Sequence, residues 1–268
     1  MHQKYSGEKI NFNYIYNKIR EVYGKKELPL TGFFNIYYYT ILKDKRPVLV
    51  YQMGKVGSST VWDSLRYYGI KPVFHLHLLN PPVNSYGKRI NRYIISKSRK
   101  ADLITLVRNP IARIISGFQG YISRNLNSSM EELNKKFLEL TSSDHPSFRW
   151  FDWEMKPVTG IDVFKTRFPK KKGWQIIEKD DYRLLIVKLE LEDKLIEESI
   201  QKFLDLNPDF QLVRSNVTTK KEFGDIYDKF KKQLKLPKDY LDMMLNSKYC
   251  KHFYTKGEID NIRKKYDI

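Results

Sequence analysis

The chain has little cysteine and little histidine: Cys250 is the single cysteine, and five histidines occur among 268 residues. One cysteine excludes an internal disulfide framework and a cysteine-rich zinc site. No run of about 18 apolar residues occurs, so we expect no segment to cross a membrane. The first twenty residues also lack the apolar stretch of a signal peptide. These absences together predict a cytoplasmic protein.

Internal repeats and low-complexity linkers are lacking as well, which excludes solenoids and collagen-like chains. Hydrophobic residues make up 41% and aromatic residues 14%, values typical of a globular protein. We predict a single domain over 1–268. It would comprise an N-terminal wrapping segment (1–46), an α/β core (47–190) and a helical C-terminal part (191–268).

Charge of one sign is abundant. The 49 Lys and Arg exceed the 31 Asp and Glu, for a formal net charge of +18. Such a charge attracts nucleic acid, acidic polysaccharide, anionic lipid or a phosphorylated small molecule, and it does not choose among them. A lysine-rich composition without any functional meaning explains the charge equally well.

Apolar runs alternate with helical patterns in the core. The runs predict strands at 47–53, 71–77, 102–108 and 184–189, and the spacing between them predicts helices at 60–68 and 87–100. A further helix would begin at Asn109, with the asparagine as N-cap and Pro110 in its first turn. This alternation predicts a three-layer α/β fold. A P-loop-like central parallel sheet would be flanked by helices, with a mostly helical C-terminal third.

Three unusual features follow three of the predicted strands. Lys55 lies in a Gly/Ser loop after the first strand, His75 and His77 end the second, and Arg108 ends the third. Ligands of open α/β sheets bind beyond the carboxyl ends of the strands. We therefore expect these side chains to share one site.

The Gly54–Ser59 loop joins a strand to a helix, where free backbone N–H groups and the positive helix end can bind an anion. The loop differs from a Walker A motif, in which the lysine follows the last glycine. Here Lys55 precedes the Gly-Ser-Ser stretch. An ordinary tight turn before a helix remains the alternative interpretation.

Arg108 is followed eight residues later by Ser116, which the predicted helix places on the same face as Asn109 and Arg113. An arginine supplies a planar fork of donors that suits a phosphate. Taken alone, the pattern is equally compatible with Arg113 as a solvated charge and Ser116 as a small packing residue.

Together, Tyr51-Gln-Met-Gly-Lys-Val-Gly-Ser-Ser-Thr60 and Leu106-Val-Arg-Asn-Pro-Ile-Ala-Arg-Ile-Ile-Ser-Gly-Phe118 resemble the sulfotransferases that use 3′-phosphoadenosine 5′-phosphosulfate (PAPS). The resemblance implies that the core over 47–190 binds this nucleotide. It further implies a site for the 3′-phosphate at Arg108 and Ser116. A site for the 5′-phosphosulfate is implied at Lys55, Val56, Gly57, Ser58, Ser59 and Thr60.

A second resemblance covers the distant segments Trp150–Glu154, Gly160–Val163 and Lys251–Tyr254. They look like bacterial proteins of capsular-polysaccharide synthesis or sulfotransferase-like type. This resemblance implies a bacterial-type protein whose acceptor is a carbohydrate.

The group that deprotonates the acceptor would come from the His75-Leu-His77 string. Residues 75 and 77 of a strand point to the same side, and a histidine suits proton transfer at neutral pH. The string resembles the His-x-His of uronyl 2-O-sulfotransferases, which implies His77 as the base beside His75. A structural role, a substrate-orienting role or a metal pair are the alternatives, although no further ligand cluster lies nearby and sulfuryl transfer needs no metal. Glu154 is the reserve base, and a solvated charge is the other interpretation of that residue.

The function predicted from these motifs is transfer of a sulfuryl group from PAPS to a hydroxyl by in-line displacement. Lys55 would meet the charge that grows on the leaving phosphate. The acceptor would be a carbohydrate, which the basic stretches suit if it is anionic, and nucleic acid is not expected as a partner. Glu154, Arg113 and Lys220 are candidate substrate-binding residues. The Lys220 loop is equally well explained as plain surface.

Two other kinds of function remain open, and a third is disfavoured. The chain could be a tyrosine or small-molecule sulfotransferase with Glu154 as base, or a non-enzymatic protein that binds polyanions or nucleic acid. A P-loop kinase would require the Walker A lysine and an acidic Mg²⁺ ligand, and neither is evident.

Overall fold

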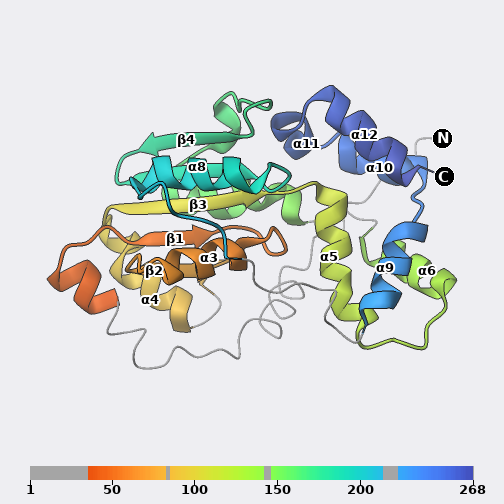
Figure 1. Cartoon of the computed structure of the whole chain (residues 1–268), viewed down its shortest axis with the longest axis horizontal. Helices are drawn as coiled ribbons and strands as arrows, with labels where there is room; N and C mark the ends of the chain where they lie inside the picture. Colours follow the sequence, from red (N-terminus) through yellow and green to blue (C-terminus); the bar gives the residue numbers. More distant parts are fainter. Residues whose placement is uncertain (1–35, 83–84, 142–145, 214–222, 268) are drawn as a thin grey trace, which may run out of the picture.

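A five-stranded sheet forms the centre of the fold in a computed structural model that describes residues 36–82, 85–141, 146–213 and 223–267 (Figure 1). The strand order is β2-β1-β3-β5-β4. The strands are β1 (Val48–Tyr51), β2 (Val73–Leu76), β3 (Ala101–Val107), β4 (Trp174–Lys179) and β5 (Tyr182–Lys188).

The sheet is mostly parallel. β1 pairs in parallel with β2 and β3, and β3 pairs in parallel with β5, whereas β4 runs antiparallel to β5. The prediction of a parallel sheet is thus wrong at one edge. β4 is a half-exposed edge strand in which polar residues interrupt the apolar ones, so it lacks the continuous apolar run that indicates a buried strand.

The crossover helices between the parallel strands are α3 (Ser58–Tyr67) and α4 (Ser85–Tyr93), the latter followed by the short η2 (Ile95–Lys97). The single helix predicted over 87–100 is therefore wrong in extent. Ser98 adopts a left-handed conformation with φ of 46°, which ends the helical stretch before β3. α5 (Pro110–Ile122) begins as predicted, with Asn109 Oδ1 accepting from the N–H groups of Ile111 and Ala112.

The remaining elements are mostly helical, as predicted for the C-terminal part. Figure 1 shows α5, α6 and α9 grouped at one end of the sheet and α10 to α12 beside them. These elements are η1 (Ile36–Leu42), α6 (Met130–Thr141), η3 (Pro146–Arg149), η4 (Phe151–Met155), α7 (Lys156–Thr159), η5 (Val163–Lys165), α8 (Asp193–Leu204), α9 (Gly224–Gln233), α10 (Lys238–Leu245), α11 (Lys248–Phe253) and α12 (Lys256–Tyr266).

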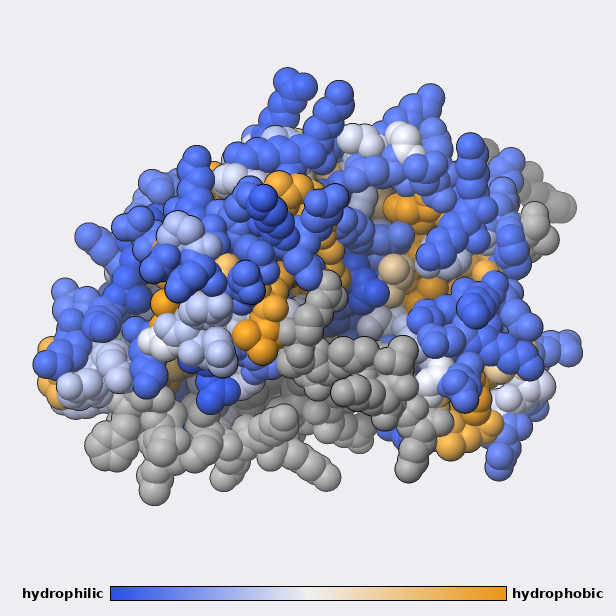
Figure 2. All heavy atoms as spheres, in the orientation of Figure 1, coloured by the Kyte–Doolittle hydropathy of each residue, from blue (hydrophilic) through white to orange (hydrophobic). Residues whose placement is uncertain are grey.

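β1 and β3 lie at the centre of the hydrophobic core. Both strands are buried along their whole length, as expected for strands covered on both faces. On the face seen in Figure 2, the coloured surface is mainly hydrophilic, with hydrophobic residues in areas between the hydrophilic ones. None of the helices in the described ranges is long and apolar enough to cross a membrane.

Candidate functional site

The carboxyl ends of β1, β2 and β3 bring the three sequence features to one edge of the sheet. The parallel pairing sets Tyr51 of β1 opposite Leu76 of β2, and β3 lies on the other side of β1. The loop after β1 and the residues after β2 and β3 therefore leave the sheet side by side. The expectation that they meet at one edge agrees with this topology.

The loop between β1 and α3 has an unusual backbone. Lys55 and Gly57 both have positive φ, 69° and 78°. A Cβ on Gly57 would lie 2.7 Å from Cδ1 of Leu189, so this position favours glycine for its conformation and for space. Gly57 is also the N-cap of α3, and no side chain caps that helix. The first turn of α3 thus presents backbone N–H groups that follow Lys55 closely in the sequence.

Two arginines donate hydrogen bonds to backbone carbonyls of this loop. Arg108 directly follows β3, and Arg113 lies on α5. Arg108 Nη1 donates to the Lys55 oxygen at 3.0 Å, and Arg113 Nη1 donates to the Gly54 oxygen at 3.2 Å. Arg113 is buried, so the interpretation as a solvated charge does not hold. These contacts join the two motifs directly, because the arginines of the second motif hold the backbone of the first.

Tyr249 fixes the backbone of Arg108. The Arg108 N–H donates to the Tyr249 hydroxyl at 3.0 Å, and the hydroxyl in turn donates to the Arg108 carbonyl oxygen at 3.0 Å. Tyr249 lies on α11, 141 residues away in sequence. Sequence reasoning missed this tyrosine because no local pattern links it to β3.

β2 ends at Leu76, so His75 lies on the strand and His77 lies just after it, not at its end as predicted. Both histidines contact Gln52, another residue that sequence reasoning missed. The Gln52 side-chain nitrogen lies 3.3 Å from His75 Nε2 and 3.3 Å from His77 Nδ1. Ser58 Oγ lies 2.8 Å from His75 Nε2. In the part of the chain that the structure describes, no third His, Cys, Asp or Glu joins them as a candidate metal ligand.

The tautomer of His77 follows from one contact. His77 Nδ1 lies 2.9 Å from the Gln52 backbone oxygen, which can only accept, so Nδ1 carries the proton and Nε2 carries the lone pair. Burial lowers the pKa of His77 below its ordinary value, and the charge of Lys55 lowers it further, against the opposing hydrogen bond to Gln52. The imidazole is therefore neutral at neutral pH.

Glu154 is fully buried, so the alternative of a solvated charge does not hold. Its carboxylate accepts from the Tyr51 hydroxyl and from the backbone N–H groups of Leu79 and Asn80. Burial raises its pKa to about 7. Nearby, Trp150 Nε1 donates to the His77 carbonyl oxygen at 3.1 Å. The segment around η4 thus holds the chain that follows His77.

The remaining predicted residues lie as follows. Val56 and Ser58 are buried in the loop, Ser59 and Thr60 are half-buried in the first turn of α3, and Ser116 is half-buried on α5. Lys220 lies outside the described residues. The binding roles of all these residues remain predictions.

Comparison with known proteins gives one family similarity. Residues 124–255, just under half of the chain, match a family described as "Putative capsular polysaccharide synthesis protein". The similarity suggests a family related to capsular polysaccharide synthesis, in agreement with the second resemblance. It includes Glu154 and Tyr249, and it does not include Lys55, His77 or Arg108.

A second similarity is local. The chain is 34% identical over 90 residues to the DNA-dependent protein kinase catalytic subunit of Gallus gallus, which covers 30% of this chain and 2% of that protein. An alignment over so small a part of the kinase assigns no activity to this chain. No solved structure is significantly similar to the chain.

Proposed function

We propose that the protein is an enzyme of polysaccharide synthesis that transfers a sulfuryl group from PAPS to a hydroxyl of a carbohydrate. The observation that carries the proposal is the contact between Arg108 and the Lys55 carbonyl, at the edge where His77 also lies. A lysine-bearing anion loop, an arginine for a second phosphate and a neutral histidine thereby adjoin one another. The match to the capsular-polysaccharide family supports the carbohydrate acceptor.

The residues present fit the two charged ends of the nucleotide. The uncapped first turn of α3 and the Lys55 ammonium would hold the 5′-phosphosulfate, because both supply positive potential without an acidic residue in that turn. Arg108 and Ser116 would hold the 3′-phosphate. The P-loop-like character of the core is part of this proposal, which rests on the loop and not on a Walker A motif.

The bound nucleotide supplies the sulfuryl group, and the protein supplies position and charge. Lys55 and the N–H groups of the α3 first turn stabilise the negative charge that grows on the leaving phosphate oxygen. His77 Nε2 accepts the proton of the acceptor hydroxyl, because Nδ1 is held as a donor by Gln52. Burial, with a smaller contribution from the Lys55 charge, lowers the pKa of His77 and keeps the imidazole neutral before the transfer.

His77 is a better base than Glu154 in this arrangement. The Glu154 carboxylate already accepts from Tyr51, Leu79 and Asn80, so its hydrogen bonds are directed into the fold. We therefore propose that His77 is the base and that Glu154 positions the segment after it.

The test is a transfer assay with ³⁵S-labelled PAPS and a panel of acceptors: neutral glycans, uronic-acid glycans and tyrosine peptides. The proposal expects label on a glycan, in an EDTA-containing buffer, with His77→Asn inactive and Lys135→Ala fully active. Lys135 is an exposed residue of α6 that belongs to neither motif. Label on tyrosine peptides alone would refute the glycan acceptor. An absence of transfer to every acceptor, together with an absence of nucleotide binding, would refute the whole proposal.

A further inference from the structure

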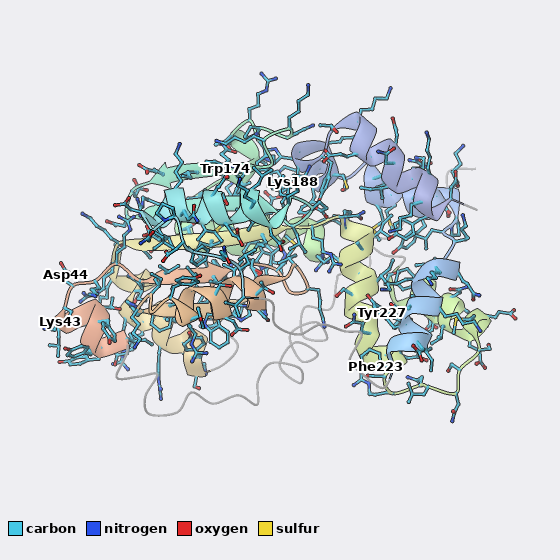
Figure 3. The ribbon with its side chains drawn as sticks, viewed as in Figure 1. Lys43, Asp44, Trp174, Lys188, Phe223 and Tyr227 are labelled. Atoms are coloured by element: carbon cyan, nitrogen blue, oxygen red, sulfur yellow. The ribbon has the colours of Figure 1, made fainter. Side chains whose placement is uncertain are left out.

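An open cavity of about 340 Å³ lies at the carboxyl end of β5, where nothing described so far has a role. It lies between the turn before β4, the end of β5 and the start of α12. Figure 3 shows Lys188 at this end of the sheet, next to α11 and α12. The lining residues are Lys170, Lys171, Lys188, Glu190, Leu191, Thr255 and Glu258.

The turn that carries two of these lysines is closely fixed. The Gly173 N–H donates to the Pro169 oxygen at 2.9 Å, and the Gly173 oxygen accepts from the Lys188 N–H at 2.8 Å. Gly173 has φ of 77°, and a Cβ there would lie 2.6 Å from Cδ2 of Leu191. The backbone that presents Lys170 and Lys171 is thus held against the wall of the cavity.

Both carboxylates of the cavity already have partners within the protein. Glu190 accepts from the Asn109 N–H at 2.5 Å and from the Tyr254 hydroxyl at 3.1 Å. Glu258 pairs with Lys188 through one oxygen and accepts from the Thr255 N–H at 2.7 Å through the other. Neither carboxylate needs a ligand to satisfy its hydrogen bonds.

The lysines differ in this respect. Lys188 is buried, pairs with Glu258 and lies 4.6 Å from the centre of the Tyr254 ring. Within the described ranges, Lys170 and Lys171 have no acidic side chain within ion-pair distance. The charge of Lys170 also affects a neighbouring histidine. Burial lowers the pKa of His252 to about 4, and the positive charge of Lys170 contributes to this shift. Uncompensated positive charge thus faces a concave and partly enclosed space.

We propose that this cavity is an anion-binding site that takes a carboxylate, sulfate or phosphate group on the ammonium groups of Lys170 and Lys171. The site is separate from the α3 loop, since Glu190 and its bond to Asn109 lie between the cavity and Arg108. It is nevertheless close to the loop, because Leu189, which lies between the lining residues Lys188 and Glu190, has its Cδ1 only 2.7 Å from where a Cβ on Gly57 would lie. The inference is independent of sulfuryl transfer, because its ligand is defined by charge alone.

The test measures protection of the two lysines in the full chain. An amine-reactive acetylating reagent is applied at about 0.15 M salt, where long-range charge effects are screened. The probes are inorganic sulfate, a galacturonate hexamer and 3′-phosphoadenosine 5′-phosphate (PAP), and modification is quantified by mass spectrometry at Lys170, Lys171 and Lys135. The expected result is protection of Lys170 and Lys171 by an anionic probe and no protection of Lys135.

A matched pair of variants completes the design. Lys170→Ala/Lys171→Ala is compared with Lys135→Ala/Lys229→Ala, which removes the same charge from exposed positions of α6 and α9. We expect affinity for the protecting probe to fall about tenfold in the first pair and to be unchanged in the second. Protection by the hexamer or by sulfate identifies an external anion, whereas protection by PAP alone identifies a nucleotide phosphate as the occupant.

Two results would overturn the proposal: no protection by any probe, or equal loss of affinity in both variant pairs, which indicates non-specific attraction. Neither result bears on the proposed function, because both concern Lys170 and Lys171, whereas the proposed nucleotide site is formed by the α3 loop and Arg108. Conversely, a protein that binds the hexamer here but does not bind PAP keeps this site and loses the proposed function.

Discussion

Two cation-rich regions lie at the same edge of the sheet, and they differ in how their charges are compensated. At the β1 loop, Arg108 and Arg113 donate to backbone carbonyls, which carry no net charge. At the β5 cavity, Lys188 pairs with the carboxylate of Glu258. A carbonyl group does not cancel the positive charge of the cation it binds, so that charge can still attract an anionic ligand. A carboxylate cancels it, so the pair contributes to the stability of the fold. Replacing Arg108 should therefore affect ligand binding, whereas replacing Lys188 of the second region should affect stability.

The largest expected effect is the loss of the base in the first region. His77→Asn should lower the rate of sulfuryl transfer by about 10²- to 10⁴-fold, because no other group accepts the acceptor proton. Its affinity for PAP should stay near that of the parent protein. Steady-state transfer and calorimetry measure the two quantities separately. A variant that keeps its transfer rate would show that His77 is a structural residue.

The next effect concerns nucleotide binding at Arg108. Arg108→Ala should weaken PAP binding by about 10- to 100-fold, as expected for the loss of a charged hydrogen bond to phosphate. Arg108→Lys keeps the charge without the planar fork and should recover only part of that loss. Fluorescence or calorimetric titration measures both variants. Equal affinity in all three proteins would place the 3′-phosphate elsewhere.

The second region should respond in stability. Lys188→Ala removes the buried partner of Glu258 and should lower the free energy of unfolding by about 2 kcal/mol, a value reduced because the Glu258 side chain is 38% exposed. PAP affinity should not change. Denaturant unfolding measures the effect, and Lys188→Met/Glu258→Gln, which keeps an acceptor for the Thr255 N–H, is the control that should restore part of the stability. A variant of unchanged stability but weakened PAP binding would reverse the assignment of the two regions.

The smallest predicted effect is on the pH dependence of stability, in which Glu154 and Glu258 should differ. Burial raises the pKa of Glu154 to about 7, so the fold favours its protonated form. That contribution is full below the ordinary pKa of 4.5 and is lost as the pH rises through 7. Glu154→Gln should therefore gain stability relative to the parent protein between pH 5 and pH 8, by about 1 to 2 kcal/mol.

Glu258 should behave in the opposite way. Burial is the largest single influence and would raise its pKa, but the hydrogen bonds from Lys188 and Thr255 and the charge of Lys188 together outweigh burial and lower it. Its contribution is present above the ordinary pKa of 4.5 and is lost as the pH falls through the lowered value. Glu258→Gln should thus be destabilising at pH 7 and closer to neutral at pH 3. Unfolding curves across pH measure how each variant changes the free energy of unfolding. Changes of the same sign at pH 7 in Glu154→Gln and Glu258→Gln would refute the difference between the two carboxylates.

Much of the fold is predictable from the sequence because β1, β3 and β5 are almost wholly buried and each contains a run of apolar residues. The Asn109 cap and Pro110 likewise mark the start of α5 by local chemistry. The edge strand β4 and the break of helix 87–100 depend on exposure and on the backbone of Ser98, which the apolar pattern does not encode.

The site was predictable only where its residues are close in sequence. The Lys55 loop, His77 and Arg108 each follow a strand, and strand ends share an edge. Gln52 lies within the first motif, but its contacts with His75 and His77 are tertiary. Tyr249 and Glu190 reach the same edge from segments 81 residues or more away. The burial of Glu154 is also a tertiary property, since its partners Leu79 and Asn80 lie 75 and 74 residues away.

The most direct test of the central claim is a calorimetric titration of the protein with PAP in EDTA, before any acceptor is known. The account predicts one molecule bound per chain, with affinity lost in Lys55→Ala and retained in Lys188→Ala. No binding by the parent protein, or equal binding by Lys55→Ala and the parent, would contradict the assignment of the β1 loop as the site of the phosphosulfate.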